Sequence, residues 1–348
     1  MRKEQDMKHT VLLTTDLYHP HNDPNDHWNL ATLFALHKAG QIDLAGVLCD
    51  EDKPDRKRWS DNFGDPSIES IAQLNYLTAS FVPVGIGSHD PIRCDADLLR
   101  AAENGERVSS IRLMLSVLES SALPVDIHLT GSCRDVVIAA AMRPDLFRRG
   151  RVRVFLNAGT WGPQEPMEYN VSLEPYAFSK VFELPCDVYW APCFEKLEPY
   201  PYHVSERANY YEIDQGEFLP ELSPGLQNYF LYMFDHVRTE GWLSYIQGEV
   251  RADRLRHWCG VKRQMWSTPG FLLSAGLACT SDGTLLPEGE CADPLFAYTP
   301  VRVRCAPSGL LEWEDAAADT GVAMFRLYDK ERYVRAMTKL VLELLKTI

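Results

Sequence analysis

The sequence predicts an α/β protein in which an open, mainly parallel sheet is flanked by helices and followed by a mostly helical C-terminal part. Two observations carry this prediction. In the first 195 residues, short apolar runs alternate with amphipathic stretches, which is the pattern of βαβ units. From about residue 220 onward, apolar residues recur mostly with helical spacing. A chain of 348 residues fits one large α/β domain with insertions, so we expect a single domain over 1–348.

Strands and helices are predicted in alternation along the first half of the chain. Strands are expected at 10–14, 42–48, 82–86, 125–129, 152–156 and 187–191. Helices are expected at 26–39, 66–79, 107–121, 132–142 and 174–183. We expect the crossovers between parallel strands to be right-handed.

The second half begins with segment 194–218, which is rich in tyrosine and proline and is predicted to be a long aromatic loop insertion. Such a loop is typical either of a functional segment or of a surface insertion that packs on its own aromatic side chains. The subregion 220–280 is predicted to be helical. A hairpin is expected at 296–314, and a C-terminal helix at about 329–347, where apolar residues follow a period close to 3.6. Within the helical subregion, the candidates are 225–248, 251–258 and 263–276.

Composition excludes several classes of partner. The net charge of −14 argues against nucleic acid and against an anionic membrane surface, so a small neutral molecule is the favoured partner. Nine cysteines without a C-x-x-C pair indicate free thiols in a reducing compartment. With no signal peptide and no apolar run long enough to span a membrane, we expect a cytoplasmic protein. The oligomeric state is left open, and a homo-oligomer is one alternative.

An acidic loop follows the first predicted strand. Asp16 ends this strand, and Asp23, Asn25 and Asp26 precede the first predicted helix. In open α/β sheets, ligands bind at the carboxyl ends of strands, and grouped carboxylates there suit Ca²⁺ or Mg²⁺. The alternative is that Asp23 caps the helix and Asp26 closes a capping box, which leaves Asp16 unexplained.

Three further stretches carry polar residues next to predicted elements. The turn at Thr130 ends a strand, so its carbonyl would face the same crevice as Asp16. Glu168 and Asn170 are two residues apart, so in an extended loop both side chains would point the same way and clamp vicinal hydroxyls, unless they are ordinary turn residues. Asp293 precedes a proline, a pair that is also typical of a helix N-cap.

Together these stretches resemble the inosine–uridine-preferring nucleoside hydrolase superfamily, in the form of a divergent nucleoside hydrolase-like branch. The similarity runs from about residue 10 to 195 and resumes at 290–297. The residues that match the motifs of this family are Asp16 (strand-end aspartate), Asn25-Asp26 (paired aspartates), Thr130-Gly131 (Thr-Gly turn), Met167-Glu168-Tyr169-Asn170 (Ala-Glu-Phe-Asn ribose clamp) and Ala292-Asp293-Pro294 (late His-Asp-Pro).

The resemblance implies a metal-dependent hydrolase that cleaves the N-glycosidic bond of a ribonucleoside or related riboside. Its cofactor would be one divalent cation, Ca²⁺ in preference to Mg²⁺, and Asp16 would help to deprotonate a metal-bound water. The implied metal ligands are Asp16, Asp26, Asp293 and the carbonyl of Thr130. The expected substrate-binding residues are Asp23, Asn25, Trp161, Glu168, Asn170 and His203.

Two departures from the family pattern shape these expectations. Asn25 stands where the family has the first of two aspartates, unless Asp23 supplies that carboxylate. Ala292 stands where related enzymes carry a histidine that helps a purine leave, so atypical leaving-group activation is expected, with His203, His27 or a tyrosine of the aromatic loop as a substitute. The alternative function is a catalytically silent nucleoside- or ribose-binding protein that retains the metal pocket.

Overall fold

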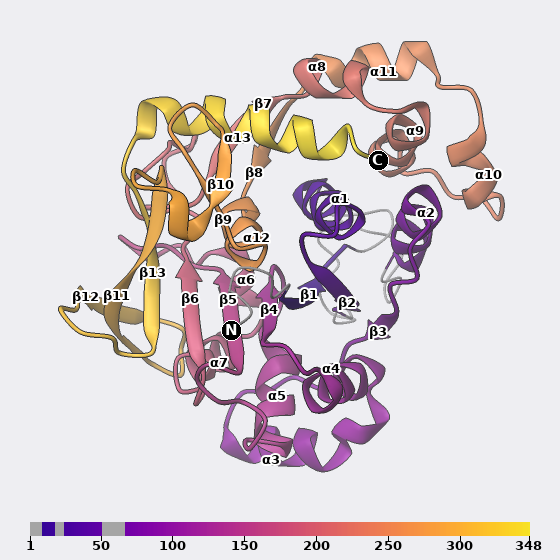
Figure 1. The fold of residues 1–348 in the computed structure, drawn as a ribbon. Coiled ribbons are helices and arrows are strands. Elements are labelled where there is room, and N and C mark those ends of the chain that lie inside the picture. Colours follow the sequence, from indigo (N-terminus) through magenta and orange to yellow (C-terminus); the bar gives the residue numbers. More distant parts are fainter. Residues whose placement is uncertain (1–8, 18–23, 51–66) are drawn as a thin grey trace, which may run out of the picture.

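An open sheet with helices on both faces forms the centre of the molecule (Figure 1). The computed structural model describes residues 9–17, 24–50 and 67–348. Within these residues, the nine strands of the main sheet are β1 (Thr10–Thr15), β2 (Asp43–Cys49), β3 (Val84–Ile86), β4 (Val125–Leu129), β5 (Val152–Asn157), β6 (Asp187–Ala191), β11 (Phe296–Cys305), β12 (Leu311–Asp315) and β13 (Val322–Leu327). Two small antiparallel pairs are β7 (Tyr211–Asp214) with β8 (Lys262–Met265) and β9 (Leu277–Cys279) with β10 (Leu285–Pro287).

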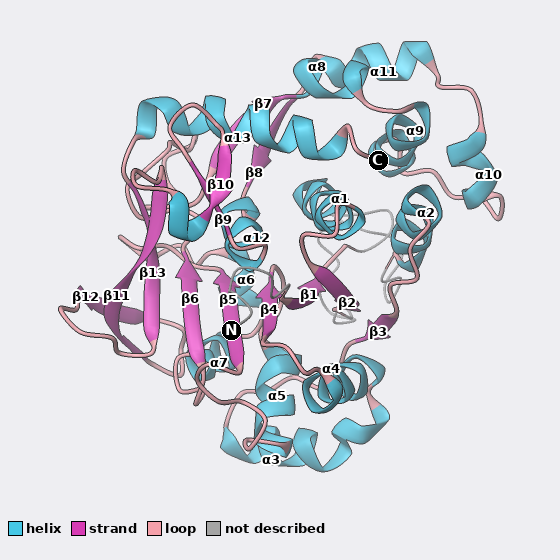
Figure 2. Cartoon of the chain, viewed as in Figure 1, coloured by secondary structure: helices cyan, strands magenta, loops and turns pink. Residues whose placement is uncertain are grey.

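Helices cover the sheet from two sides (Figure 2). The α-helices are α1 (Pro24–Lys38), α2 (Ile68–Thr78), α3 (Asp95–Asn104), α4 (Ser109–Ser120), α5 (Arg134–Met142), α6 (Tyr169–Leu173), α7 (Pro175–Val181), α8 (Gln215–Phe218), α9 (Pro224–Phe234), α10 (Trp242–Gln247), α11 (Ala252–Cys259), α12 (Thr268–Ser274) and α13 (Lys330–Leu345). Helices α1, α2, α9, α12 and α13 lie over one face, and α3, α4, α5 and α7 lie over the other (Figure 1). None of the described helices has the length and apolar character that crossing a membrane requires.

The central strands are apolar on both faces because both faces are covered. In β1, Val11 and Leu13 belong to the core under α1 and α13, whereas Leu12 belongs to the core over α4 and α5. This alternation follows from the period of two along a strand. A strand buried on both sides therefore reads as the continuous apolar run that the sequence shows.

The order of the strands reverses at β1. The sheet runs β3-β2-β1-β4-β5-β6-β13-β11-β12, and β1 pairs in parallel with both β2 and β4. The chain therefore moves outward from β1 through β2 and β3, then returns to the other side of β1. In an open α/β sheet, the crevice at such a switch point is where ligands bind.

The predicted fold class is confirmed, with several local differences. The hairpin appears as β11 and β12, and the C-terminal helix appears as α13. The single helix predicted at 225–248 is wrong: α9 and α10 are separate, and His236 between them has a positive φ of 50° that a helix cannot contain. The aromatic loop contains β7, and the helical subregion contains β8. All nine cysteines are free thiols, as predicted.

Candidate functional site

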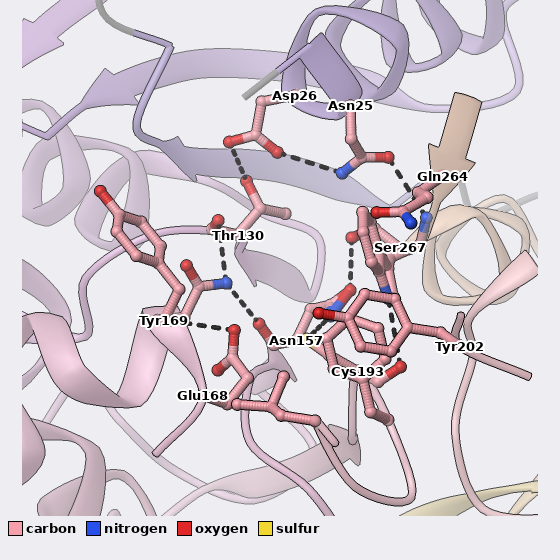
Figure 3. A pocket seen from close by; sticks show the side chains of 14 residues that line it. Asn25, Asp26, Thr130, Asn157, Glu168, Tyr169, Cys193, Tyr202, Gln264 and Ser267 are labelled. Carbon is pink, nitrogen blue, oxygen red and sulfur yellow. Dashed lines mark hydrogen bonds between the residues drawn. The ribbon is translucent and has the colours of Figure 1, made fainter. Parts of the chain in front are cut away.

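A cavity of about 240 Å³ opens at the carboxyl edge of the sheet, beside the switch point (Figure 3). Its walls come from the start of α1, the residues after β4, β5 and β6, the start of α6, and the link between β8 and α12. The lining residues are Asn25, Asp26, Thr130, Asn157, Glu168, Tyr169, Asn170, Cys193, Phe194, Leu197, Tyr202, Gln264, Trp266 and Ser267.

Asp26, in the first turn of α1, is the buried carboxylate of this cavity. Its Oδ2 accepts hydrogen bonds from the hydroxyls of Thr15 (2.7 Å) and Thr130 (3.3 Å) and from the backbone N–H of Asp16 (3.4 Å). Its Oδ1 accepts from the side-chain amides of Asn29 (3.3 Å) and Asn25 (3.5 Å). Burial raises the pKa of the Asp26 carboxyl, and its hydrogen bonds, including one to the Asp16 side chain, oppose this rise.

The floor of the cavity is a network of amides and carbonyls. The Asn170 side chain donates from Nδ2 to the carbonyls of Thr130 (3.3 Å) and Asn157 (3.0 Å), so it ties two strand ends together. The Asn157 side chain accepts a hydrogen bond from the Ser267 hydroxyl at 2.7 Å and donates to the Cys193 sulfur at 3.0 Å. The floor is therefore fixed by contacts between five separate strand-end and helix-start segments.

Glu168 holds the shape of the loop that carries Asn170. It is the N-cap of α6, and its carboxylate accepts from the backbone N–H groups of Gly159 (2.8 Å), Asn170 (3.1 Å) and Val171 (3.3 Å). Burial raises the pKa of Glu168, and these backbone hydrogen bonds act in the opposite direction. The carboxylate is thus engaged with the backbone, which makes it a positioning group.

Aromatic side chains form the opposite wall. The rings of Phe194 and Tyr202 lie 4.1 Å apart between centroids, and Trp266 meets Phe194 edge to face at 5.5 Å. The Trp266 indole N–H donates to the carbonyl of Cys193 at 3.1 Å, which fixes the orientation of the ring. In Figure 3, Tyr202 and Cys193 lie at the end of the cavity away from Asp26. One end of the cavity is therefore polar and the other aromatic.

The link between β8 and α12 is held in a strained conformation. Ser267 has a φ of 59°, in the left-handed region that serine rarely adopts. The backbone N–H of Trp266 donates to Oδ1 of Asn25 at 3.2 Å, which joins this link to α1. Residues held in such conformations are often found at functional sites, because surrounding contacts must maintain them.

Comparison with known proteins identifies the fold. No family model matches the chain, and no curated protein sequence matches it. Among solved structures, the effector protein XOO4466 is similar with a TM-score of 0.59 and 15% identity, covering 98% of this chain and 94% of that one. The type III effector protein XopQ, complexed with adenosine diphosphate ribose, gives 0.53 and 13% over the same shares. The purine-preferring ribonucleoside hydrolase from Gardnerella vaginalis gives 0.50 and 11%, covering 97% and 100%.

The chain has a nucleoside hydrolase-like fold. At these identities the likeness concerns the fold, so the chemistry has to be argued from the residues of this cavity.

The nucleoside hydrolase-like chain brings together most of the residues that its sequence singled out. Those that line the cavity are Asn25, Asp26, Thr130, Glu168 and Asn170. Asp16 is buried against Asp26. Asp23 lies outside the described residues.

Other predicted residues lie elsewhere. The indole N–H of Trp161 donates to Ser205, and its ring packs edge to face on Trp313, so it does not line the cavity. His203 is exposed, and it does not line the cavity either. His27 is buried in α1, where its Nε2 lies 3.2 Å from the Ser70 hydroxyl. Tyr202, the neighbour of His203 in the aromatic loop, does line the cavity.

The residues present do not form the metal site that the resemblance implied. Among the described residues, no three His, Cys, Asp or Glu side chains form a group that could hold a metal ion. Asp293 is exposed, and its neighbour Pro294 makes a β-bridge with Thr280 ahead of strand β11. Asp293 does not line the cavity, so its role as a metal ligand beside Asp16 and Asp26 stays a prediction without support from this geometry. The Asp-Pro pair precedes a strand here, although the same pair often opens a helix.

Several of the lining residues that sequence reasoning missed lie around the start of α12, and others, such as Asn157 and Phe194, follow strands β5 and β6. Ser267-Thr268-Pro269 opens this helix, with proline in its first turn, and Ser267 lines the cavity. This stretch contains neither histidine nor aspartate. A hydroxyl residue followed by Pro is a helix-start signal, which is the only cue that the sequence offered.

Proposed function

We propose that the cavity binds a neutral riboside, with the ribose on the polar floor and the aglycone against the aromatic wall. The observation that carries the proposal is the division of one cavity into two ends. Asp26 and the Asn170–Asn157 network supply hydrogen-bonding groups at one end, and Phe194 and Trp266 supply ring faces at the other. A riboside is divided in the same way, into a polyhydroxylated sugar and a flat aglycone.

The charge of the cavity favours a ligand without phosphate. The described lining residues include the carboxylates Asp26 and Glu168 and contain no Lys, Arg or His. Phosphate groups are normally bound by such cationic side chains or by helix N-termini, and of the helices that begin at this cavity, α1 carries Asp26 in its first turn and α6 is capped by Glu168. XopQ was solved with adenosine diphosphate ribose, and we expect this chain to prefer the uncharged nucleoside portion of such a ligand. A volume of about 240 Å³, small for a ligand pocket, agrees with this preference.

Hydrolysis of the N-glycosidic bond is a second candidate, favoured by the contact between Asp16 and Asp26. Two buried carboxyl groups in contact, one with a raised pKa, are typical of catalytic sites. A carboxylate near the anomeric carbon would stabilise an oxocarbenium-like transition state. Because no histidine is among the described lining residues, we expect slow release of inosine or adenosine bases and faster cleavage of p-nitrophenyl riboside.

Binding is tested by titration calorimetry of the full chain with inosine, adenosine, uridine, free ribose and ADP-ribose. We expect measurable binding of at least one nucleoside, weaker binding of ribose because the aromatic wall is unused, and weaker binding of ADP-ribose. If none of the nucleosides binds, or if ADP-ribose binds more tightly than adenosine, the assignment of a neutral riboside is wrong. A reducing-sugar assay on the same panel, with p-nitrophenyl riboside added, then separates a hydrolase from a binding protein.

A further inference from the structure

The carboxylate of Asp26 is enclosed by hydrogen-bond donors of the protein itself. The groups within hydrogen-bonding distance of its two oxygens are the hydroxyls of Thr15 and Thr130, the side-chain amides of Asn25 and Asn29, and the backbone N–H of Asp16, at 2.7 to 3.5 Å. Thr15, Asn25, Asn29 and the backbone of Asp16 direct a hydrogen toward the carboxylate, whereas the Thr130 hydroxyl shares its single hydrogen between Asp26 and the carbonyl of Thr14, 3.0 Å away. The side chain of Asp16 is also hydrogen-bonded to Asp26. This arrangement is the one that stabilises a buried anion by hydrogen bonding.

A divalent cation needs the opposite kind of surroundings. Ca²⁺ takes six to eight oxygen ligands, and carboxylates and carbonyls supply them through their lone pairs. Around Asp26, hydroxyl and amide hydrogens occupy directions from which a cation would approach. The carbonyl of Thr130, expected as a further ligand, already accepts a hydrogen bond from Asn170.

The position of Asp26 in its helix works in the same direction. Asp26 lies in the first turn of α1, a helix of 15 residues. The positive end of a helix dipole stabilises a negative side chain in the first turn. The helix dipole therefore supplies part of the electrostatic stabilisation that a bound cation would give to this carboxylate.

We propose that this cavity binds its riboside without a divalent metal ion, because the donors around Asp26 occupy the place that the ion has in a metal-dependent site. The inference rests on the proposed function, since it concerns the same cavity and ligand class. A ribose hydroxyl donates its hydrogen directly to the Asp26 carboxylate in this arrangement. The chain would thus have kept the sugar-binding end of the site and replaced the ion by side-chain amides and hydroxyls.

The first test measures the riboside affinity of the full chain after dialysis against EDTA, and again with excess CaCl₂ or MgCl₂. The probe is the nucleoside of the panel that gives the largest binding heat. We expect the Kd to change by less than roughly twofold on adding either cation. A tightening of roughly tenfold or more with Ca²⁺ or Mg²⁺ would overturn the inference.

A second test needs no riboside, so it separates failure of this inference from failure of the proposed function. CaCl₂ alone is titrated into the EDTA-dialysed chain, and the melting temperature is recorded with and without the cation. We expect no binding heat and no rise in melting temperature. A rise that the Asp26→Asn variant abolishes would show a calcium site at Asp26. If no nucleoside binds under any condition while calcium also has no effect, the proposed function fails and the metal-free state of Asp26 stands.

The exposed Asp293 provides the matched control. Asp293→Asn removes a carboxylate that the structure places on the surface, so riboside affinity and the response to calcium should equal those of the parent chain. Asp26→Asn should lose riboside affinity with and without cation. Loss of affinity or of a calcium response in Asp293→Asn would mean that Asp293 reaches the cavity, and the inference would be overturned.

Discussion

Two buried aspartates near opposite ends of neighbouring strands have opposite surroundings. Asp126 is the second residue of β4 and pairs with Val11 near the start of β1. Its carboxylate is bound by the Arg153 guanidinium at 2.7 and 2.6 Å, and His9 Nδ1 lies 3.2 Å away. Asp26 follows the other end of β1, and its hydrogen-bond donors include hydroxyls, amides and a backbone N–H.

The comparison of these two sites distinguishes a carboxylate that stabilises the fold, Asp126, from one that lines the cavity, Asp26. Burial alone would raise the pKa of Asp126, but hydrogen bonds from Arg153 and His9 hold it well below its usual range. The pKa of Asp26 is raised, because its neutral hydrogen-bond donors offset only part of the increase in pKa that burial causes. A buried carboxylate without a matched cation destabilises the folded state, so its presence in a cleft points to function.

The largest effect on stability is expected at the ion pair. Asp126→Asn leaves the half-buried Arg153 guanidinium without its counter-ion, and breaking a buried pair in this way lowers the free energy of unfolding by about 3–5 kcal/mol. Urea unfolding followed by circular dichroism measures the change. Asp97→Asn, which removes an exposed ion pair with Arg100, is the control and should unfold like the parent chain. If Asp126→Asn is as stable as the parent chain, the distinction between Asp126 and Asp26 is wrong.

A large effect on binding is expected at the aromatic wall. Trp266→Ala should weaken nucleoside binding by about 1–3 kcal/mol, the range found when a base loses its aromatic stacking partner. Trp161→Ala is the matched control, because this tryptophan lies outside the cavity and packs on Trp313. Titration calorimetry compares both with the parent chain. Equal losses in the two variants would show that the effect is general destabilisation, or that Trp161 contacts the ligand after all.

An effect of similar size on binding is expected at the floor of the cavity. Asn170→Ala removes the amide that joins the carbonyls of Thr130 and Asn157, and the loss of such a hydrogen-bonding group amounts to about 1–3 kcal/mol. We expect this loss in the free energy of nucleoside binding, and we expect the binding of free ribose to weaken as well. Asn104→Ala, on the surface of α3, is the control. Should Asn170→Ala bind as well as the parent chain, the floor does not hold the sugar.

The smallest effect is a pH dependence that originates in β4. Burial lowers the pKa of His128 from 6.5 to about 3, so the folded chain keeps this imidazole neutral. The stability that this residue contributes is present above pH 6.5 and is lost as the pH falls toward about 3, because the unfolded state binds the proton first. Denaturant midpoints measured from neutral pH to about pH 5 should fall, and less so in His128→Phe. A midpoint that rises as the pH falls would show that the pH dependence of stability is dominated by Asp26, whose raised pKa acts in the opposite direction.

The sequence predicted the sheet better than it predicted the cavity. Strands such as β1 and β4 are continuous apolar runs, and their ends mark where Asp26 and Thr130 would meet. Trp266 could not be found in the same way, because its contact with Asn25 spans 241 positions and no local pattern encodes it. The element that follows Asp293 could not be predicted for a related reason, since the Asp-Pro pair gives the same local signal in front of a helix and in front of a strand.

The predicted sugar clamp shows a second limit of sequence reasoning. Glu168 and Asn170 were expected to point the same way in an extended loop, but α6 begins between them. Glu168 therefore caps the helix, and Asn170 alone reaches the floor. The positive φ of Ser267 could not be predicted either, because a glycine in the sequence often indicates a positive φ, whereas a serine does not.

The distance along the chain between the parts of the cavity has a consequence for its assembly on the ribosome. Thr15 and Asn29 are made within a few residues of Asp26, whereas Thr130 follows 104 positions later. The link at Trp266, which bonds Asn25, is made later still. A nascent chain therefore contains the strands at the centre of the sheet well before it contains the aromatic wall, and because domains generally fold as units, the cavity is completed late. Ligand binding is therefore a property that a chain can acquire only after Trp266 has been added, and it can report on a late step of folding.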